Sequence, residues 1–295
     1  MFFRNWRKRS PGKEGNGFVN RAKVLPDNNT VPVVSKEGIQ QGLEDVGLAK
    51  GDVVFVHSSL SSFGRVEGGA DAVVDALLET VGAEGTVVMP TFTWDAFHDK
   101  ERVVFDVAKT PCETGAIPEA LRKRPAVMRS PHICHSVAAL GLHAKDVMGD
   151  GRSPFGQGST FARLYDLDCQ YLFLGVGFSA CTALHMVEEF MQVPYRYYRD
   201  FAGSTVRLPD GTEMPSRSVE FLKKPGYRND LAKMEPIFSA AGILRVGQVG
   251  KARIIATTIR QIFDLTLEYL KQDIGFLLTK ESRQLLRARE DRHDR

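Results

Sequence analysis

The stretch that decides the predicted fold is residues 171–189, YLFLGVGFSACTALHMVEE. It begins with an uninterrupted apolar run, which is typical of a strand buried on both faces of a sheet. A turn of small residues follows, and helical spacing of the apolar residues begins at Thr182. A side chain on the first turn after a buried strand lies at the edge of the sheet, where α/β proteins bind ligands. The stretch therefore predicts an α/β protein with a ligand site at this edge.

One titratable residue of this stretch, His185, lies near the start of the predicted helix. Glu188 and Glu189 follow at helical offsets of three and four, so either carboxylate can lie beside the imidazole. An imidazole titrates near neutral pH, and a nearby anion raises its basicity. The pattern fits a general base, and it also fits a histidine that caps or packs an amphipathic helix.

The composition limits the classes of protein that the chain can belong to. It has 295 residues, a formal net charge of +3 and 43% hydrophobic residues, which is enough for one large core. The nearly balanced charge does not indicate a nucleic-acid or membrane partner. No apolar run is long enough to span a bilayer, and the first residues lack the features of a signal peptide. Four cysteines without a CxxC pair predict reduced thiols in a cytoplasmic protein.

The domain organisation follows from changes in composition along the chain. Residues 1–30 are polar, basic and without a sustained period, so we expect a disordered arm. Residues 31–279 contain the periodic segments and no clean linker, which predicts a single domain. Residues 280–295 are dominated by charge, and we expect this tail to fray. The sequence leaves a homodimer open.

Two further strands are predicted to end at the same edge of the sheet. The buried run at residues 53–56 is followed by small and polar residues, namely His57, Ser58, Ser59 and Leu60. Such a turn next to a helix start suits a phosphate or pyrophosphate, and a plain tight turn is the alternative. A second strand at residues 85–94 is followed by Asp95. Because parallel strands end together, we expect Asp95 to lie at the same edge as His57.

The remaining segments add loops, a hairpin and a helix. Arg129 and Ser130 are anion-binding residue types in a loop before a short predicted strand. Residues 203–214 predict a hairpin turned by Asp210-Gly211, and residues 216–222, which carry Glu220, are expected to continue that sheet. The last elements expected are a short strand at residues 246–255 and an amphipathic helix at residues 259–278.

Several motifs occur in one order over about residues 35–278. They are VHSSL (56–60) with GGA (68–70), GTVVMP (85–90), RS (129–130) with His132, SVAA (136–139), LGV (174–176), TALH (182–185) with Glu188, and GQVG (247–250) with Ala252. By these motifs the chain resembles the aminoglycoside 3-N-acetyltransferases and their relatives. The resemblance implies a three-layer α/β/α fold with a central mixed sheet, distinct from the Gcn5-type acetyltransferases.

The resemblance also implies an activity. Acetyl-CoA is the expected donor, and an amine of an aminoglycoside or a related amino sugar is the expected acceptor, as in antibiotic resistance. A non-antibiotic biosynthetic amine and a non-catalytic ligand-binding role remain alternatives. The sequence pI of about 8.6 weakens the aminoglycoside assignment relative to another amine acceptor, since enzymes that act on polycationic aminoglycosides tend to be acidic. The chain also has His132-Ile133 where the family usually has His-Pro.

The resemblance assigns roles to individual residues. His185 is the expected catalytic histidine, supported by Glu220 or by Glu188 at helical reach. Asp95 is expected to hold the acceptor. The expected contacts to coenzyme A come from the turn after the first strand and from the loop at residues 129–130, and they are His57, Ser58, Ser59, Leu60, Arg129 and Ser130. Thr182 is a seventh expected contact on mechanistic grounds, because the developing thioester oxyanion needs donors, and the backbone N–H groups of residues 177–182 and the Thr182 hydroxyl are the candidates.

Two alternative chemistries are open from the residues themselves. Cys181 precedes His185 by four residues, and a Cys–His pair can form an acyl-enzyme, although apolar neighbours favour a buried thiol. Histidine and cysteine at positions 132, 134, 135 and 185 are metal-ligand types. Because the H-I-C-H spacing directly precedes a strand, we expect several of these side chains to face opposite sides, and we predict no metal.

Overall fold

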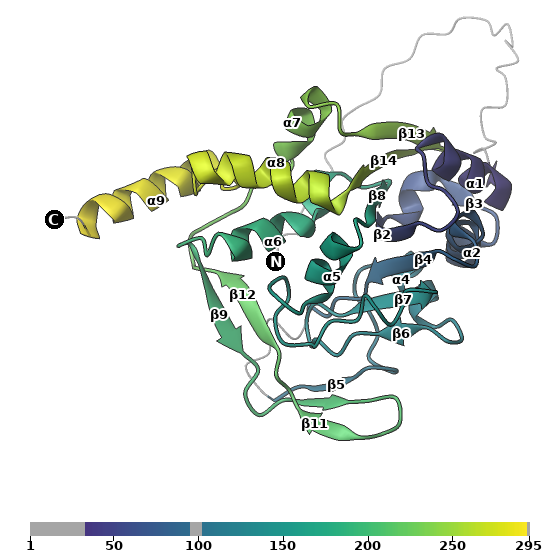
Figure 1. Ribbon diagram of the computed structural model, residues 1–295, viewed down its shortest axis with the longest axis horizontal. Coiled ribbons are helices and arrows are strands. Elements are labelled where there is room, and N and C mark those ends of the chain that lie inside the picture. Colours follow the sequence, from purple (N-terminus) through teal and green to yellow (C-terminus); the bar gives the residue numbers. More distant parts are fainter. Residues whose placement is uncertain (1–32, 95–101, 294–295) are drawn as a thin grey trace, which may run out of the picture. The chain divides into compact units, whose positions relative to one another are not determined.

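The centre of the protein is a mixed seven-stranded sheet. The computed structural model describes residues 33–94 and 102–293 (Figure 1). Strands β8, β2 and β4 run parallel, and the flanking strands are antiparallel to their neighbours. In spatial order the strands are β13 (Arg245–Val249), β14 (Ala252–Thr258), β8 (Gln170–Leu174), β2 (Val53–Ser58), β4 (Thr86–Pro90), β7 (Val137–Gly141) and β6 (Met128–Arg129).

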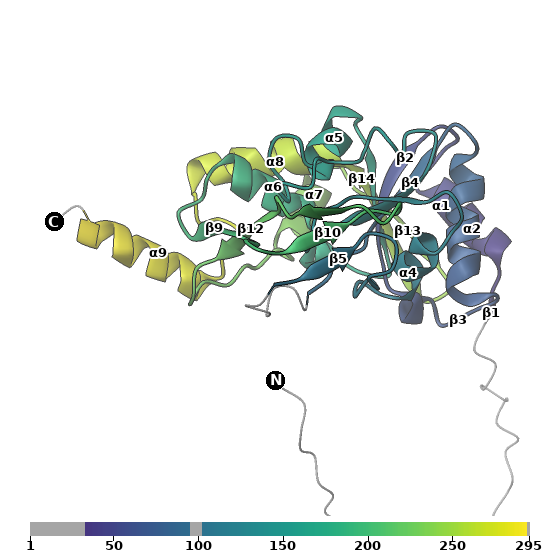
Figure 2. The same ribbon diagram turned by 90° about the horizontal axis from the view of Figure 1, so that it is seen from below.

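Helices cover both faces of this sheet. Alternate residues of each strand face opposite sides, so Val54 and Val56 pack into one core while Phe55 packs into the other. Figure 2 shows the two helical layers on either side of the sheet. One layer contains α1 (Lys36–Asp45), α2 (Gly69–Val81) and α4 (Ala116–Arg122), and the other contains α5 (Thr160–Asp166), α6 (Ala183–Phe190), α7 (Met234–Ala240) and α8 (Ile259–Gln272). The predicted three-layer α/β/α fold with a mixed sheet is confirmed.

Local sequence explains where these elements begin and end. The Ser35 side chain accepts a hydrogen bond from the Gly38 N–H and starts α1. Thr258 and Gln261 form a capping box at the start of α8. The chain leaves β8 at Gly175, whose φ is +70° and where a Cβ would lie 2.4 Å from the Ser62 Cβ. This turn leads into the short 3₁₀ helix η2 (Phe178–Ala180) and then into α6.

Short strands outside the central sheet form small sheets around the site. The predicted hairpin is confirmed, and its strands β10 (Thr205–Arg207) and β11 (Glu213–Pro215) lie beside β5 (Val104–Asp106). The prediction that residues 216–222 continue this sheet is wrong, because β12 (Val219–Lys223) pairs with β9 (Arg196–Asp200) instead. Between the two sheets, the buried Ser218 hydroxyl donates a hydrogen bond to the Gly151 carbonyl. The last short elements are β1 (Val33–Val34), β3 (Arg65–Val66) and η1 (Leu60–Phe63).

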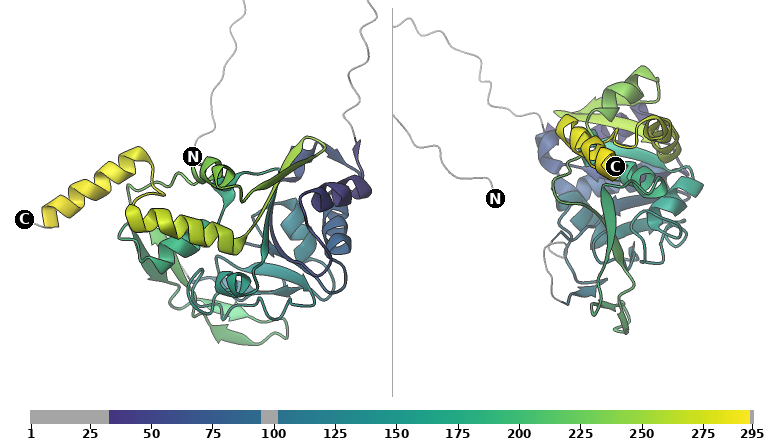
Figure 3. Two further views of the ribbon diagram at one scale, coloured as in Figure 1. Left: turned by 45° about the horizontal axis from the view of Figure 1, so that its top comes forward. Right: turned by 90° about the vertical axis from the view of Figure 1, so that its left-hand side faces the viewer.

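The end of the chain differs from the expected frayed tail. Residues 280–293 form a helix, α9 (Lys280–His293), which Figure 3 shows in yellow beyond the end of α8. Leu286 on α9 is buried in a cluster with Tyr195 and Tyr227, so apolar packing holds a helix that composition alone did not predict. No helix in the described part of the chain is long and apolar enough to cross a membrane. The expected N-terminal arm lies outside the described residues.

Candidate active site

A pocket of about 510 Å³ lies at the carboxyl ends of the three parallel strands. β2 contributes His57 and Ser58, β4 ends in the wall at Pro90, and Val176 follows β8. This is the edge at which open α/β sheets bind ligands, as the sequence predicted. The other residues that line the pocket are Phe92, Trp94, Thr114, His135, Phe155, Ser179, Ala180, Cys181, Thr182, His185, Arg196, Glu220, Phe221, Leu222, Lys223 and Leu231.

His185 and Glu188 form the central pair of this site. Both lie on α6, one helical turn apart, and His185 Nδ1 is 2.6 Å from Glu188 Oε2. The Glu188 carboxylate is fully buried, and Arg196 Nη2 lies 2.7 Å from the same oxygen. The other oxygen, Oε1, accepts hydrogen bonds from the Tyr195 hydroxyl at 2.9 Å and the Asn229 amide at 2.7 Å.

The partners of Glu188 keep it ionised despite its burial. Burial alone would raise its pKa, but the charge of Arg196, the imidazole of His185 and the hydrogen bonds lower the pKa to about 2. An ionised carboxylate can only accept, so the hydrogen between the two residues lies on His185 Nδ1. The other ring nitrogen, Nε2, therefore keeps its lone pair.

His185 is neutral at neutral pH for a different reason. Burial lowers its pKa, and the nearby Arg196 charge lowers it further, while Glu188 raises it less than these two lower it together. Arg196 Nη2 is 3.0 Å from Nδ1, so the guanidinium acts on the ring at close range. A neutral imidazole on a pocket wall, with an Nε2 that has no hydrogen-bond partner among the described residues, is in the state that a general base requires.

Glu220 belongs to a second histidine–carboxylate pair. The structure brings Glu220 to the pocket from β12, but its Oε2 lies 2.9 Å from His135 Nδ1 and not beside His185. The His135 ring packs edge-on against Phe92, Phe155 and Trp94, with centroids 4.6, 4.9 and 6.0 Å away. Of the two carboxylates expected near His185, the geometry therefore selects Glu188.

Three of the seven residues expected to contact coenzyme A line the pocket, and they are His57, Ser58 and Thr182. His57 Nε2 lies 2.8 Å from the Tyr171 hydroxyl, which also accepts a hydrogen bond from the Ala183 N–H. Burial lowers the pKa of His57 to about 3, so this ring is neutral. The buried Ser58 Oγ has no hydrogen-bond partner in the described part of the chain, which suits contact with a ligand.

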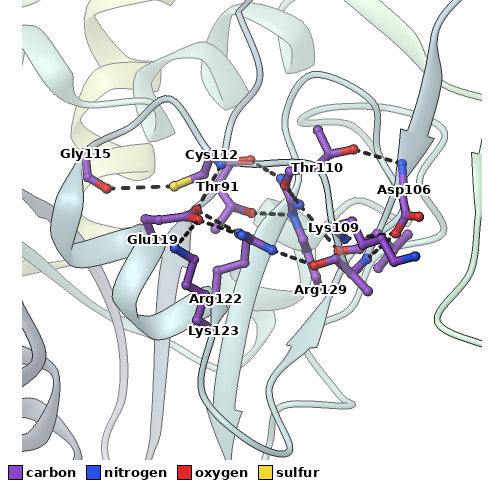
Figure 4. A network of polar contacts seen from close by, with 12 residues as sticks. Thr91, Asp106, Lys109, Thr110, Cys112, Gly115, Glu119, Arg122, Lys123 and Arg129 are labelled. Carbon is purple, nitrogen blue, oxygen red and sulfur yellow. Dashed lines mark hydrogen bonds and ion pairs between the residues drawn. The ribbon is translucent and has the colours of Figure 1, made fainter.

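The other four expected contacts are absent from the pocket wall, and they are Ser59, Leu60, Arg129 and Ser130. Arg129 is buried in the polar network of Figure 4, where its Nε donates to the Thr91 hydroxyl at 3.0 Å and its Nη2 to the Thr91 carbonyl at 2.8 Å. The Ser130 hydroxyl accepts from the Val137 N–H. These side chains hold β4, β6 and β7 together, so their polar groups are already used. Asp95, the expected acceptor contact, lies outside the described residues.

The two alternative chemistries find little support. Burial raises the pKa of Cys181 to about 12, which keeps the thiol protonated at neutral pH. The ligand atoms of His132, His135 and Glu220 lie within 4.8 Å of one another, because residues 133–135 form a turn and the side chains do not diverge as expected. However, His132 Nδ1 accepts from the Cys134 and His135 N–H groups, and its Nε2 donates to the Val219 carbonyl at 3.0 Å. Neither of its nitrogens is free for a metal.

Some site residues were not singled out by the sequence patterns, and they are Tyr195, Arg196, Lys223 and Asn229. Arg196 reaches Glu188 because β9 starts directly after the turn that ends α6. Asn229 comes from a segment 41 residues beyond Glu188. No periodicity or local spacing connects such residues to the site, so only long-range pairing identifies them.

Solved structures of aminoglycoside acetyltransferases share this architecture. A mutant of AAC(3)-IVa in complex with a gentamicin is 28% identical, with a TM-score of 0.70 over 85% of this chain and 94% of that chain. The binary complex of AAC-IIIb with CoASH is 24% identical, with a TM-score of 0.70 over 82% of this chain and 97% of that chain. The fold is therefore that of a class of N-acetyltransferases separate from the Gcn5 type.

The sequence comparison specifies the family. The chain belongs to the aminoglycoside 3-N-acetyltransferase family, because the sequence model of that family matches residues 55–271. Aminoglycoside N(3)-acetyltransferase IV of Salmonella sp is 36% identical over 235 residues, which cover 78% of this chain and 85% of the relative. The expected resemblance is confirmed, and the protein is an N-acetyltransferase.

Proposed function

We propose that the protein transfers the acetyl group of acetyl-CoA directly to an amine of an aminoglycoside or a related amino sugar, with His185 as general base. The observation that carries this proposal is the His185–Glu188 pair, which presents a neutral imidazole to a pocket at the edge of the sheet. The fold neighbour described as a binary complex with CoASH supports the donor. The buried Ser58 Oγ without a partner in the described chain fits a polar group of that donor.

The proton inventory assigns a role to each member of the pair. The neutral amine of an amino sugar is the nucleophile, and its nitrogen must lose one proton as the new C–N bond forms; His185 Nε2 accepts that proton. The imidazolium is stabilised by the ionised Glu188 at Nδ1. When the C–S bond breaks, the same proton passes from Nε2 to the leaving thiolate, so the enzyme returns to its starting state. No covalent acetyl-enzyme is needed on this route.

The thioester oxygen gains charge during the transfer and needs a donor. We expected backbone N–H groups of residues 177–182 to serve, but two of them already donate within η2, from Ala180 to the Gly177 carbonyl and from Cys181 to the Phe178 carbonyl. The Thr182 hydroxyl lines the pocket and lies 3.5 Å from the Ala180 carbonyl, a long contact that a ligand can replace. We therefore retain Thr182 as the proposed donor.

The four cysteines support a cytoplasmic site of action. All of them lie in the described part of the chain, and none is in a disulfide. Reduced thiols are the rule in the cytoplasm.

The proposal is tested by thiol release from acetyl-CoA with a panel of amines, using wild-type protein and His185→Ala. Loss of a positioned base lowers kcat by about 10²- to 10⁴-fold. The matched control is His143→Ala, because His143 is paired with Asp146 and is not part of the pocket wall. Near-normal turnover of His185→Ala with the best acceptor would remove the assignment of the base.

A further inference from the structure

Lys223 is a charged side chain of the pocket that the reaction described above does not use. It is the last residue of β12 and lines the main pocket beside Phe221 and Leu222. It also lines an adjoining hollow of about 330 Å³ that shares His185 with the main pocket. In the part of the chain that the structure describes, its ammonium group makes no hydrogen bond and no ion pair. Lys223 thus presents a free cation next to the proposed base.

Among the described residues, the other charged side chains that line the main pocket each have a partner. Arg196 lies against Glu188, and Glu220 lies against His135. The Lys223 charge acts on the same site, since it contributes to the lowered pKa of His185. Loss of solvation at the pocket wall and the nearby Arg196 charge lower the pKa of Lys223, and the Glu188 carboxylate opposes this effect only in part.

Resting on the proposed function, we infer that Lys223 selects an acceptor that carries an anionic substituent, a phosphate or a carboxylate, near the amine that is acetylated. An ammonium group binds such anions with charge-assisted hydrogen bonds. A polycationic acceptor would instead bring ammonium groups close to Lys223, and the repulsion between like charges costs free energy. The net charge of +3 for the whole chain agrees with this preference.

The anion bound by Lys223 belongs to the acceptor and not to the donor. The thioester must lie at His185 for the transfer, whereas the phosphates of coenzyme A lie at the far end of its long pantetheine arm. A side chain whose charge acts on the His185 ring is therefore close to the reacting amine and remote from the donor's phosphates. Lys223 is accordingly a specificity-determining residue for the acceptor.

The test compares four acceptors with wild-type protein, Lys223→Met, Lys223→Glu and Lys224→Met. The acceptors are glucosamine, glucosamine 6-phosphate, galactosaminuronic acid and gentamicin. Lys224 is the matched control, because it is the next residue, donates to the Pro194 carbonyl and is not part of the pocket wall. The readouts are kcat/KM for each acceptor, KM for acetyl-CoA, and calorimetric binding of glucosamine 6-phosphate.

We expect wild-type protein to prefer an anionic amino sugar over glucosamine, and Lys223→Met to reduce that preference by about 10- to 100-fold. Lys223→Glu should raise kcat/KM for gentamicin, and Lys224→Met should change neither ratio. Unchanged acceptor ratios in Lys223→Met would overturn the inference, and so would a rise only in KM for acetyl-CoA. If no acceptor is acetylated, the proposed function fails, and the binding data still decide: equal affinity of wild type and Lys223→Met for glucosamine 6-phosphate contradicts the inference.

Discussion

The substitution Glu188→Gln tests the centre of the site through the stability of the fold. In the folded protein the pKa of Glu188 is lowered from 4.5 to about 2, and the carboxylate is fully buried. At 1.36 kcal/mol per pKa unit, this shift corresponds to about 3 kcal/mol of stabilisation by its partners. The substitution leaves Arg196 without its counter-charge. Breaking a buried ion pair in this way costs about 3–5 kcal/mol, which agrees with the value from the pKa shift. We expect the unfolding free energy of Glu188→Gln at pH 7 to fall by about 3 kcal/mol.

The pH dependence of this loss has a defined sign. A carboxyl group with a lowered folded-state pKa stabilises the protein fully above its unfolded-state pKa, near 4.5, and loses this contribution as the pH falls towards about 2. The difference between wild type and Glu188→Gln should therefore be constant above about pH 5.5 and shrink below pH 4.5. Urea unfolding at several pH values measures it.

Glu189 provides a matched control for this experiment. It is the next residue and is also buried, but burial raises its pKa, so its charge destabilises the folded state at neutral pH. Its Oε1 accepts from the Ser153 and Tyr198 hydroxyls, and a glutamine oxygen can accept the same hydrogen bonds. Glu189→Gln should therefore keep or raise stability at pH 7. Equal stability of wild type and Glu188→Gln at pH 7 would refute the electrostatic argument for the His185–Glu188 pair.

Two further predictions concern the reaction. Because burial and Arg196 lower the pKa of His185, kcat/KM should persist below pH 6.5 and decline only at lower pH. The substitution Arg196→Met should move this decline to higher pH. A pH–rate profile that is identical in wild type and Arg196→Met would contradict the role of Arg196. Because the Cys181 thiol stays protonated, Cys181→Ala should retain most of the turnover, and intact-protein mass spectrometry with acetyl-CoA should detect no acetylated Cys181; an acetylated cysteine would favour the covalent route instead.

The sequence by itself determined the elements whose signals are local. The apolar run at residues 171–174 is long enough to specify a buried strand, and the helical spacing after it specifies α6. The same spacing put Glu188 one turn from His185, and this distance does not depend on the rest of the fold. The Asp210-Gly211 turn was also readable, since it requires only residues that are neighbours in the chain.

Only the tertiary structure decided how distant residues meet. Glu220 was expected beside His185, but the pairing of β12 with β9 carries it to His135. The pairing of these strands also leaves Lys223 at the pocket, and folding brings Asn229 to Glu188. A strand's register depends on its partner's side chains and on the packing around both strands, and neither is encoded in a local period. The local sequence of one helix thus determines the His185–Glu188 pair, whereas the residues that shift the pKa values of this pair reach it only through tertiary contacts.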